Sequence, residues 1–255
     1  MQKICIVIPC YNEQFRLQAE EFLKVYHSTG FFFCFVNDGS SDDTLSLLHK
    51  LEHGREKRVL VLSLPQNRGK AEAVRTGVLQ ALGWYDFDYI GYFDADFSTP
   101  LTEVLHLLEE AGEGKLLILG SRVKRLGATI ERNLGRHYFG RVFSTVASMT
   151  LKIPVYDTQC GAKLINTKIA REIFAKPFIT RWLFDMEILA RLIELFGREE
   201  ICTSVIEIPL NEWKRKDHSH LKITHMLKVP FELWRIYFHY NLNSAGKTKP
   251  VPIVQ

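Results

Sequence analysis

The chain has 255 residues, 46% of them apolar and 24% charged, so it can bury a core of ordinary size as one globular domain. Its formal net charge of +4 is modest and does not indicate nucleic acid as a partner. The 5 cysteines are scattered and include no C-x-x-C pair, which argues against a disulfide framework or a zinc site and favours a reducing compartment.

The first half of the chain alternates short apolar runs with longer helical patterns. We expect strands at 3–9, 31–36, 58–64, 89–93 and 115–120. Helices are expected between them, at 13–28, 40–53, 70–84 and 100–111. Ser40 is the expected cap of the second helix, and Thr99 with Pro100 is the start signal of the fourth. This alternation predicts an α/β fold with a mostly parallel sheet flanked by helices.

The second half is less regular and mainly helical. Helical spacing is expected at 130–152, 167–175, 184–196 and about 221–240, with a Gly-Ala turn at 161–162 and a strand-like stretch at 201–208. The last of these helices carries a run of aromatic residues that reads either as core or as a membrane contact: Phe231, Trp234, Tyr237 and Phe238. After Asn241 the sequence reads as a loose tail.

Polar clusters follow four of the expected strands at their carboxyl ends. They lie at 9–13 (PCYNE), 37–40 (NDGS), 67–70 (NRGK) and 94–96 (DAD). In sheets of this kind, ligands bind beyond the carboxyl ends of the strands. One such cluster could be a simple turn, whereas four at the same edge predict a binding site.

The acidic pair Asp94 and Asp96 gives that site its chemistry. Alternate residues of an extended chain point the same way, so both carboxylates can face one point, where a cation would offset their repulsion. A divalent ion held by only two protein carboxylates usually bridges to substrate phosphates. The glycine-rich loops of dinucleotide-binding and P-loop proteins are missing, so a nucleotide-diphosphate substrate is favoured. The alternative is a strand-terminal turn in which Ser98 caps a helix.

Four sequence blocks, in this order, resemble the family 2 glycosyltransferases of the GT-A fold: IPCYNE, VNDGSSDDT, NRGKAEAV and DADFSTP. Farther along, GSR (120–122), DTQCGAKL (157–164), RWLFDMEIL (181–189) and EW (212–213) are similar to the dolichyl-phosphate glucosyltransferase branch and to related polyprenyl-phosphate glycosyltransferases. The resemblance covers roughly residues 3–225. It implies a single GT-A domain over 1–241, with a nucleotide-sugar-binding half (1–122) and a helical acceptor-side half (123–241), followed by a loose tail (242–255).

The resemblance also implies a metal-dependent, inverting transfer of a hexose from a nucleotide-diphosphate sugar, with UDP-glucose favoured and GDP-mannose as the alternative. Donor binding would fall to Pro9, Tyr11, Glu13, Asn37, Asp38, Arg68, Lys70 and Asp94. Asp94 and Asp96 would hold Mg²⁺ or Mn²⁺, and Asp96 would be catalytic. Asn37 stands where many relatives carry Asp, and Ser98 stands where mannosyl enzymes often carry a Gln that assists the metal.

The acceptor implied by the resemblance is a polyprenyl phosphate of the dolichyl or undecaprenyl type. A phosphate monoester has its second pKa at about 6, so it is mostly ionised at neutral pH and needs no protein base. It needs cations instead, and Arg122, Arg132 and Arg136 fit that need because guanidinium groups match phosphate oxygens.

Two other readings remain open from the residues. A saccharide hydroxyl acceptor would require a carboxylate base, for which Asp157 and Asp185 are the candidates, so Asp157 joins Asp96 and Arg122 among the expected catalytic residues. A nucleotidyltransferase or a nucleotide-binding module could use the same sheet. The glycine-rich N-terminal loop of sugar nucleotidyltransferases is, however, missing from residues 4–20.

The apolar segments bear on location. The first run is interrupted at once by Pro9, Asn12 and Glu13, unlike the core of a signal peptide. The longest weakly apolar stretch, 142–151, has about half the length of a membrane-spanning helix. We therefore expect a cytoplasmic protein, with the cytoplasmic face of a membrane as a candidate peripheral location and a membrane surface as a candidate partner.

Overall fold

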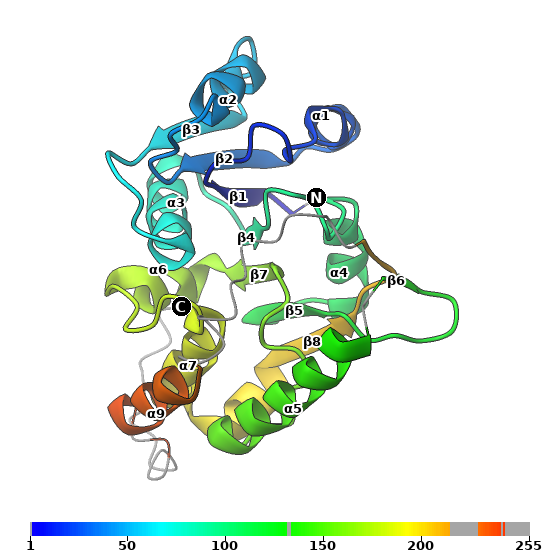
Figure 1. Ribbon diagram of the computed structural model, residues 1–255, viewed down its shortest axis with the longest axis vertical. Coiled ribbons are helices and arrows are strands. Elements are labelled where there is room, and N and C mark those ends of the chain that lie inside the picture. Colours follow the sequence, from blue (N-terminus) through cyan, green and yellow to red (C-terminus); the bar gives the residue numbers. More distant parts are fainter. Residues whose placement is uncertain (1, 132–133, 215–228, 241, 243–255) are drawn as a thin grey trace.

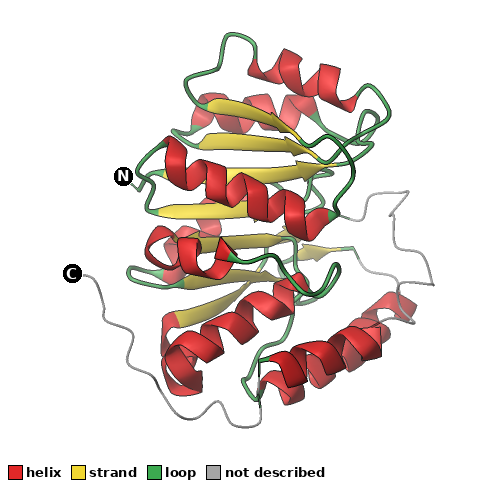
Figure 2. Ribbon diagram, turned by 90° about the vertical axis from the view of Figure 1, so that its left-hand side faces the viewer, coloured by secondary structure: helices red, strands yellow, loops and turns green. Residues whose placement is uncertain are grey.

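A computed structural model describes residues 2–131, 134–214, 229–240 and 242, and for 134–139 it describes the backbone alone. These described residues form a 7-stranded sheet in the order β3-β2-β1-β4-β7-β5-β8 (Figures 1 and 2). The strands are β1 (Ile4–Cys10), β2 (Phe32–Asn37), β3 (Val59–Ser63), β4 (Tyr89–Phe93), β5 (Leu117–Ser121), β7 (Ala162–Asn166) and β8 (Val205–Pro209). β7 runs antiparallel to both of its neighbours, and the other pairs are parallel. The prediction of a mostly parallel α/β sheet is confirmed.

Helices cover both faces of the sheet (Figure 2). They are α1 (Ala19–Ser28), α2 (Thr44–Glu52), α3 (Lys70–Trp84), α4 (Glu103–Ala111), α5 (Leu134–Leu151), α6 (Thr167–Ala175), α7 (Phe184–Ser204) and α9 (Val229–His239). A hydrophobic core lies on each face of the sheet, and side chains of β1 alternate between the two because successive residues of a strand point to opposite faces. Cys5 and Val7 pack in the core that includes α3, α6 and α7. Ile6 and Ile8 pack in the core that includes α1, α2 and α4. Two small strands, β6 (Thr129–Ile130) and β9 (Glu212–Trp213), pair separately.

The first expected helix, 13–28, is wrong in its first third. α1 begins only at Ala19, and residues 13–17 form a turn in which the N–H groups of Arg16 and Leu17 both donate to the Glu13 carbonyl at 2.9 Å. The turn ends there because Gln18 has a non-helical backbone (φ −90°, ψ 89°). This short segment therefore belongs to the loop after β1, and it places Arg16 at the edge of the sheet.

Three boundaries in the second half also differ from the expectation. Ile130, the expected first residue of a helix, is in a strand instead, because Thr129 and Ile130 pair with β9. The expected strand at 201–208 begins only at Val205, since a further helical segment continues to Ser204 after Gly197, whose φ of 80° kinks α7. Of the expected helix 221–240, residues 229–239 are helical, and 221–228 lie outside the described residues.

The expected cap of α2 is also wrong. Ser40 lies ahead of the helix, and its Oγ accepts a hydrogen bond from the Asn12 N–H at 3.0 Å. Asp42 makes the side-chain hydrogen bond at the start of α2 instead, because its Oδ1 accepts from the Thr44 N–H at 3.0 Å. Ser40 thus ties the loop after β2 to the loop after β1.

The described chain ends close to the boundary expected for the tail. Leu242 is buried, so packing extends one residue into the expected tail, and 243–255 lie outside the described residues. Four cysteines are buried and Cys202 is exposed, all with free thiols. Within the described ranges, every helix is too short or too polar to cross a membrane.

Two glycines of α3 give a matched test of how closely this helix packs on the sheet. A Cβ on Gly77 would lie 2.5 Å from Val7 Cγ1 and 2.8 Å from Val36 Cγ2, whereas a Cβ on Gly83 would meet no atom within 4 Å. We expect Gly77→Ala to destabilise by about 1–3 kcal/mol through overpacking. Gly83→Ala should stabilise by about 0.5–1 kcal/mol through helix propensity. Urea unfolding of both variants checks this, and a Gly77→Ala protein as stable as Gly83→Ala would contradict it.

Candidate functional site

The loops after β1 and β2 are joined by hydrogen bonds at the carboxyl edge of the sheet. Asn12, in a left-handed conformation with φ of 54°, accepts from the Ser41 N–H at 2.9 Å. The Glu13 N–H donates to Thr44 Oγ1 at 2.7 Å. Backbone N–H groups on each side thus donate to side-chain oxygens on the other, and these hydrogen bonds fix the position of Glu13 at the edge of the sheet.

Asp38 holds the loop after β3. Its two carboxylate oxygens accept from the N–H groups of Arg68 and Gly69 at 2.7 and 2.8 Å. Burial raises the pKa of Asp38, and these two hydrogen bonds oppose the rise. Gly69 adopts φ of 92°, which favours glycine, so the loop turns sharply into α3 and brings Lys70 to the site.

Asn37 is likewise occupied by the protein. Its Nδ2 donates to Ser63 Oγ at 2.9 Å, and its Oδ1 accepts from the Ser40 N–H at 3.2 Å. Asn37 and Asp38 are each only 2% exposed. The structure therefore places both in the support of the loops, and the donor-binding role expected for them stays a prediction.

Asp94 and Asp96 lie together just beyond β4, each beside a cationic side chain. Asp94 Oδ1 is 2.5 Å from Lys70 Nζ, and Asp96 Oδ2 is 2.6 Å from Arg16 Nη2. Asp96 Oδ1 also accepts from the Ser98 N–H at 2.9 Å. Burial opposes the charge of Lys70, but Asp94 and Asp185 outweigh it and raise the pKa of this ammonium. Lys70 is thus a cation at neutral pH.

Gly161, the residue just before β7, fixes the orientation of Asp94. Its carbonyl accepts from the Asp94 N–H at 3.2 Å. A Cβ at position 161 would fall 2.0 Å from Asp94 Oδ2, so any other residue would displace the carboxylate. The glycine of the DTQCG block is therefore required by the close approach of Asp94.

Glu13 lies next to the acidic pair and is short of partners. Its Oε1 is 3.3 Å from Arg16 Nη1, whereas its buried Oε2 has no hydrogen-bond partner among the described residues. Burial raises the pKa of Glu13 to about 7; Arg16 opposes the rise, and Asp96, Asp94 and Asp42 add to it. This carboxyl group is therefore close to half-protonated at neutral pH.

These oxygens suit a hard divalent ion. Carboxylates are the ligands that Mg²⁺ and Mn²⁺ prefer, and Mg²⁺ is often held by one or two of them together with substrate phosphates. Within the described part of the chain, no three His, Cys, Asp or Glu residues cluster to form a metal site of their own. Asp94 and Asp96 thus fit a metal that takes its remaining ligands from a substrate or water.

Arg122 and Asp157, both expected at the site, are bound to each other. Arg122 Nε and Nη2 donate to the two oxygens of Asp157 at 2.7 and 2.8 Å, and the Arg122 N–H donates to the same carboxylate at 3.1 Å. Burial opposes the charge of the guanidinium, but Asp157 raises the pKa of Arg122 well above its ordinary value. Asp157 thereby acts as the orienting counter-ion of Arg122.

Asp185 is held in a similar way. Its Oδ1 accepts from Lys163 Nζ and from the Tyr92 hydroxyl, both at 2.5 Å, and it is 3% exposed. Both carboxylates named as candidate bases for a hydroxyl acceptor are therefore committed to ion pairs. A free base must be able to accept a proton from its substrate, so this arrangement counts against that reading.

The other expected residues are less fully placed. Pro9 is the one partly exposed residue of β1, and Tyr11, just beyond the strand, is 38% exposed. Arg132 lies outside the described residues, and Arg136 lies in α5 where the backbone alone is described. Their acceptor role stays a prediction.

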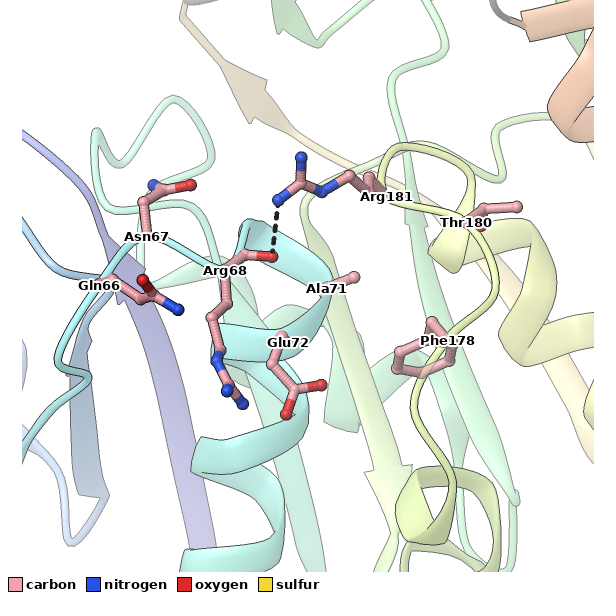
Figure 3. Close-up of a pocket in the computed structure, with 8 residues that line it drawn as sticks. All are labelled: Gln66, Asn67, Arg68, Ala71, Glu72, Phe178, Thr180 and Arg181. Atoms are coloured by element: carbon pink, nitrogen blue, oxygen red, sulfur yellow. Dashed lines mark hydrogen bonds between the residues drawn. The ribbon is translucent and has the colours of Figure 1, made fainter.

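Arg68 lines a pocket of about 370 Å³ between the loop after β3 and the segment before α7 (Figure 3). The pocket is lined by Gln66, Asn67, Arg68, Ala71, Glu72, Phe178, Thr180 and Arg181. Arg181 crosses from the far side, where its Nη2 donates to the Arg68 carbonyl at 3.4 Å (Figure 3). Arg181 was not expected at the site, although the block RWLFDMEIL contains it.

Glu187 was also missed, and it positions that pocket wall. Its carboxylate accepts from the N–H groups of Ile179 and Thr180 at 3.0–3.1 Å, and from the Tyr240 hydroxyl at 2.7 Å. Arg191 neutralises it at 2.9 Å. One buried carboxylate thus joins the pocket to the chain that follows α9. The sequence showed only an acidic residue in a helix, which is ordinarily a solvent-facing position.

The chain is similar to known proteins over most of its length. The chain matches the model "Glycosyl transferase family 2" over residues 5–174. It is 31% identical over 253 residues to a dolichyl-phosphate beta-glucosyltransferase of Mus musculus, covering 91% of this chain and 72% of that protein. The corresponding protein of Saccharomyces cerevisiae is 30% identical over 242 residues, covering 86% and 69%.

A solved structure shares the fold. It is the glucosyl-3-phosphoglycerate synthase of Mycobacterium tuberculosis in complex with Mn²⁺, uridine-diphosphate and glucosyl-3-phosphoglycerate. The TM-score is 0.64 at 15% identity, and the match covers 94% of this chain and 80% of that chain. The expected GT-A architecture is confirmed.

The raised pKa of Glu13 predicts a pH dependence of stability. The carboxyl titrates at about 7 in the folded chain against 4.5 ordinarily, so the unfolded chain ionises first and the folded state is increasingly penalised as pH rises from about 4.5 to 7. Glu13→Gln removes this penalty. Measured by urea unfolding in EDTA, the stability of the variant relative to wild type should rise by on the order of 1–3 kcal/mol between pH 5 and pH 8. A difference that does not change with pH would contradict the assignment.

Proposed function

The chain belongs to glycosyltransferase family 2, and on this basis we propose that it transfers glucose from UDP-glucose to dolichyl phosphate or a related polyprenyl phosphate, with inversion at the anomeric carbon. GDP-mannose is the alternative donor. The observation that carries the proposal is the placement of Asp94 and Asp96 with Lys70 at the carboxyl edge of the sheet. The names of the curated relatives support the glucosyl donor and the lipid phosphate acceptor.

On the donor side, Asp94 and Asp96 would hold Mg²⁺ or Mn²⁺. Such an ion, when bound, neutralises negative charge that collects on the departing diphosphate. Lys70 would bind the same diphosphate, because it begins α3 and stays charged against Asp94. Arg68, exposed in the neighbouring pocket, adds a further cation.

On the acceptor side, the ion pairs of Asp157 and Asp185 favour a phosphate over a hydroxyl. A phosphate monoester is already ionised and attacks without a base, but it must be oriented and desolvated by cations. Arg122, held in one direction by Asp157, would supply one of them. Arg132 and Arg136 are proposed to supply the others.

The test is transfer of labelled glucose from UDP-glucose to dolichyl phosphate. We expect product that partitions into organic solvent, with Mn²⁺ or Mg²⁺ required. Asp96→Asn should lower the rate at least about a hundredfold, since even changes around metal ligands commonly cost 10–100-fold. Asp86→Asn, which removes one exposed charge just ahead of β4, is the matched control and should leave the rate unchanged.

Two outcomes would contradict the proposal. If Asp96→Asn were as active as wild type in Mn²⁺, Asp96 would not be a ligand of the metal. A water-soluble disaccharide as the main product, with dolichyl phosphate unused, would move the function to a saccharide acceptor.

The proposal also includes contact with the membrane that holds the acceptor. Phe231, Trp234 and Phe238 are 60%, 56% and 57% exposed on α9, whereas Ile236 of the same helix is buried. Of the two readings of this aromatic run, the core reading is wrong for these three residues, because their side chains are exposed. α5 contacts α9 and exposes Val142, Val146 and Met149. Exposed apolar side chains flanked by cations such as Arg235 suit the headgroup region of a bilayer.

Membrane contact is checked by co-sedimentation with anionic vesicles. Wild type should bind reversibly and less at high salt, and Trp234→Ser should lower the partition coefficient about tenfold, because one large apolar side chain no longer leaves water. Leu126→Ser removes a fully exposed side chain outside these helices and serves as the control. A folded Trp234→Ser protein that sediments like wild type would refute the role of α9.

A further inference from the structure

Arg16 bridges two carboxylates at the centre of the candidate site. Its Nη2 lies 2.6 Å from Asp96 Oδ2, and its Nη1 lies 3.3 Å from Glu13 Oε1. The side chains of Arg16 and Asp96 are only 17% and 15% exposed. The guanidinium therefore already binds Asp96 Oδ2, a carboxylate oxygen that a divalent ion would need as a ligand.

Backbone and side-chain contacts together place Arg16. It follows Glu13 in the turn ahead of α1, where its own N–H donates to the Glu13 carbonyl at 2.9 Å. The buried Arg16 Nε has no hydrogen-bond partner among the described residues. A buried donor left without an acceptor is unfavourable, so the carboxylate contacts of Nη1 and Nη2 account for the placement of this side chain.

Asp94 and Asp96, the proposed metal ligands, each already face a cation. Lys70 neutralises Asp94, and Arg16 neutralises Asp96. A divalent ion entering alone adds two positive charges beside two fixed cations, and it competes with Arg16 for Asp96. A nucleotide-diphosphate sugar carries one negative charge on each of its two phosphates, so its complex with the ion enters without changing the local charge. The same side chains thus resist the ion alone and accept the complex.

We propose that Arg16 is an internal counter-ion of the metal site, which weakens binding of a divalent ion alone and thereby couples metal binding to binding of the nucleotide diphosphate. Arg16 acts through Asp96 and is a positioning residue. The coupling is reciprocal: a nucleotide that strengthens metal binding is itself bound more strongly when the metal is present. This inference rests on the proposed function, because it assumes that Asp94 and Asp96 receive a metal with a nucleotide.

The experiment measures Mn²⁺ binding by electron paramagnetic resonance, with and without UDP and with no sugar donor or acceptor present. In wild type, UDP should strengthen Mn²⁺ binding at least tenfold. Arg16→Gln removes the charge, so it should bind Mn²⁺ alone about tenfold more tightly and show a correspondingly smaller effect of UDP. Arg16→Lys keeps the charge and should behave like wild type.

A matched control separates this effect from general loss of an ion pair. Arg75 forms an ion pair with Glu72 at 2.9 Å, and its side chain is also 17% exposed. Arg75→Gln should leave Mn²⁺ binding unchanged. A gain in metal affinity cannot arise from partial unfolding, so an Arg16→Gln protein that binds Mn²⁺ alone no more tightly than wild type overturns the inference. If wild type binds no Mn²⁺ even with UDP, the proposed function fails, and the inference fails with it.

Discussion

The close approach of β7 to β4 is the constraint on which the site depends. Gly161 accepts a hydrogen bond from Asp94 and leaves room for its carboxylate, which any Cβ would displace. Because β7 runs antiparallel between β4 and β5, it begins at the same edge where those strands end. Residues 157–161 of the second half are thereby brought beside Asp94 of the first half.

A second feature is that four ion pairs lie in or beside the site, each joining two different segments. Lys70 pairs with Asp94, Arg16 with Asp96, Arg122 with Asp157 and Lys163 with Asp185. Burying an unpaired charge costs several kcal/mol, so pairs of this kind allow many charges to gather in one place. The pairs differ in role. Those of Asp94 and Asp96 lie at the proposed metal site, whereas those of Asp157 and Asp185 hold carboxylates that would otherwise be candidate bases.

The sequence predicted the sheet well where apolar runs were continuous and ended in polar clusters. The strand before Asp94 is an example, because its apolar residues stop abruptly at the acidic pair. β7 was missed because Lys163 interrupts its apolar run, and only the fold shows that Asp185 and Tyr92 satisfy this lysine. Arg16 was missed because its spacing suits a helix, whereas the chain forms a turn after Glu13, whose N–H donates to Thr44 at the start of α2. Partners this far apart along the chain produce no periodic pattern, so these contacts could not be predicted from the sequence.

The central claim is that the edge formed by Asp94, Asp96, Lys70 and Arg16 receives a metal with a nucleotide diphosphate. The most direct measurement is a crystal structure of the protein with Mn²⁺ and UDP, using anomalous scattering to locate manganese. We expect one manganese peak shared by Asp94, Asp96 and the diphosphate, with Arg16 displaced from Asp96. A diphosphate bound elsewhere, or bound here without manganese while Arg16 still contacts Asp96, would contradict the claim.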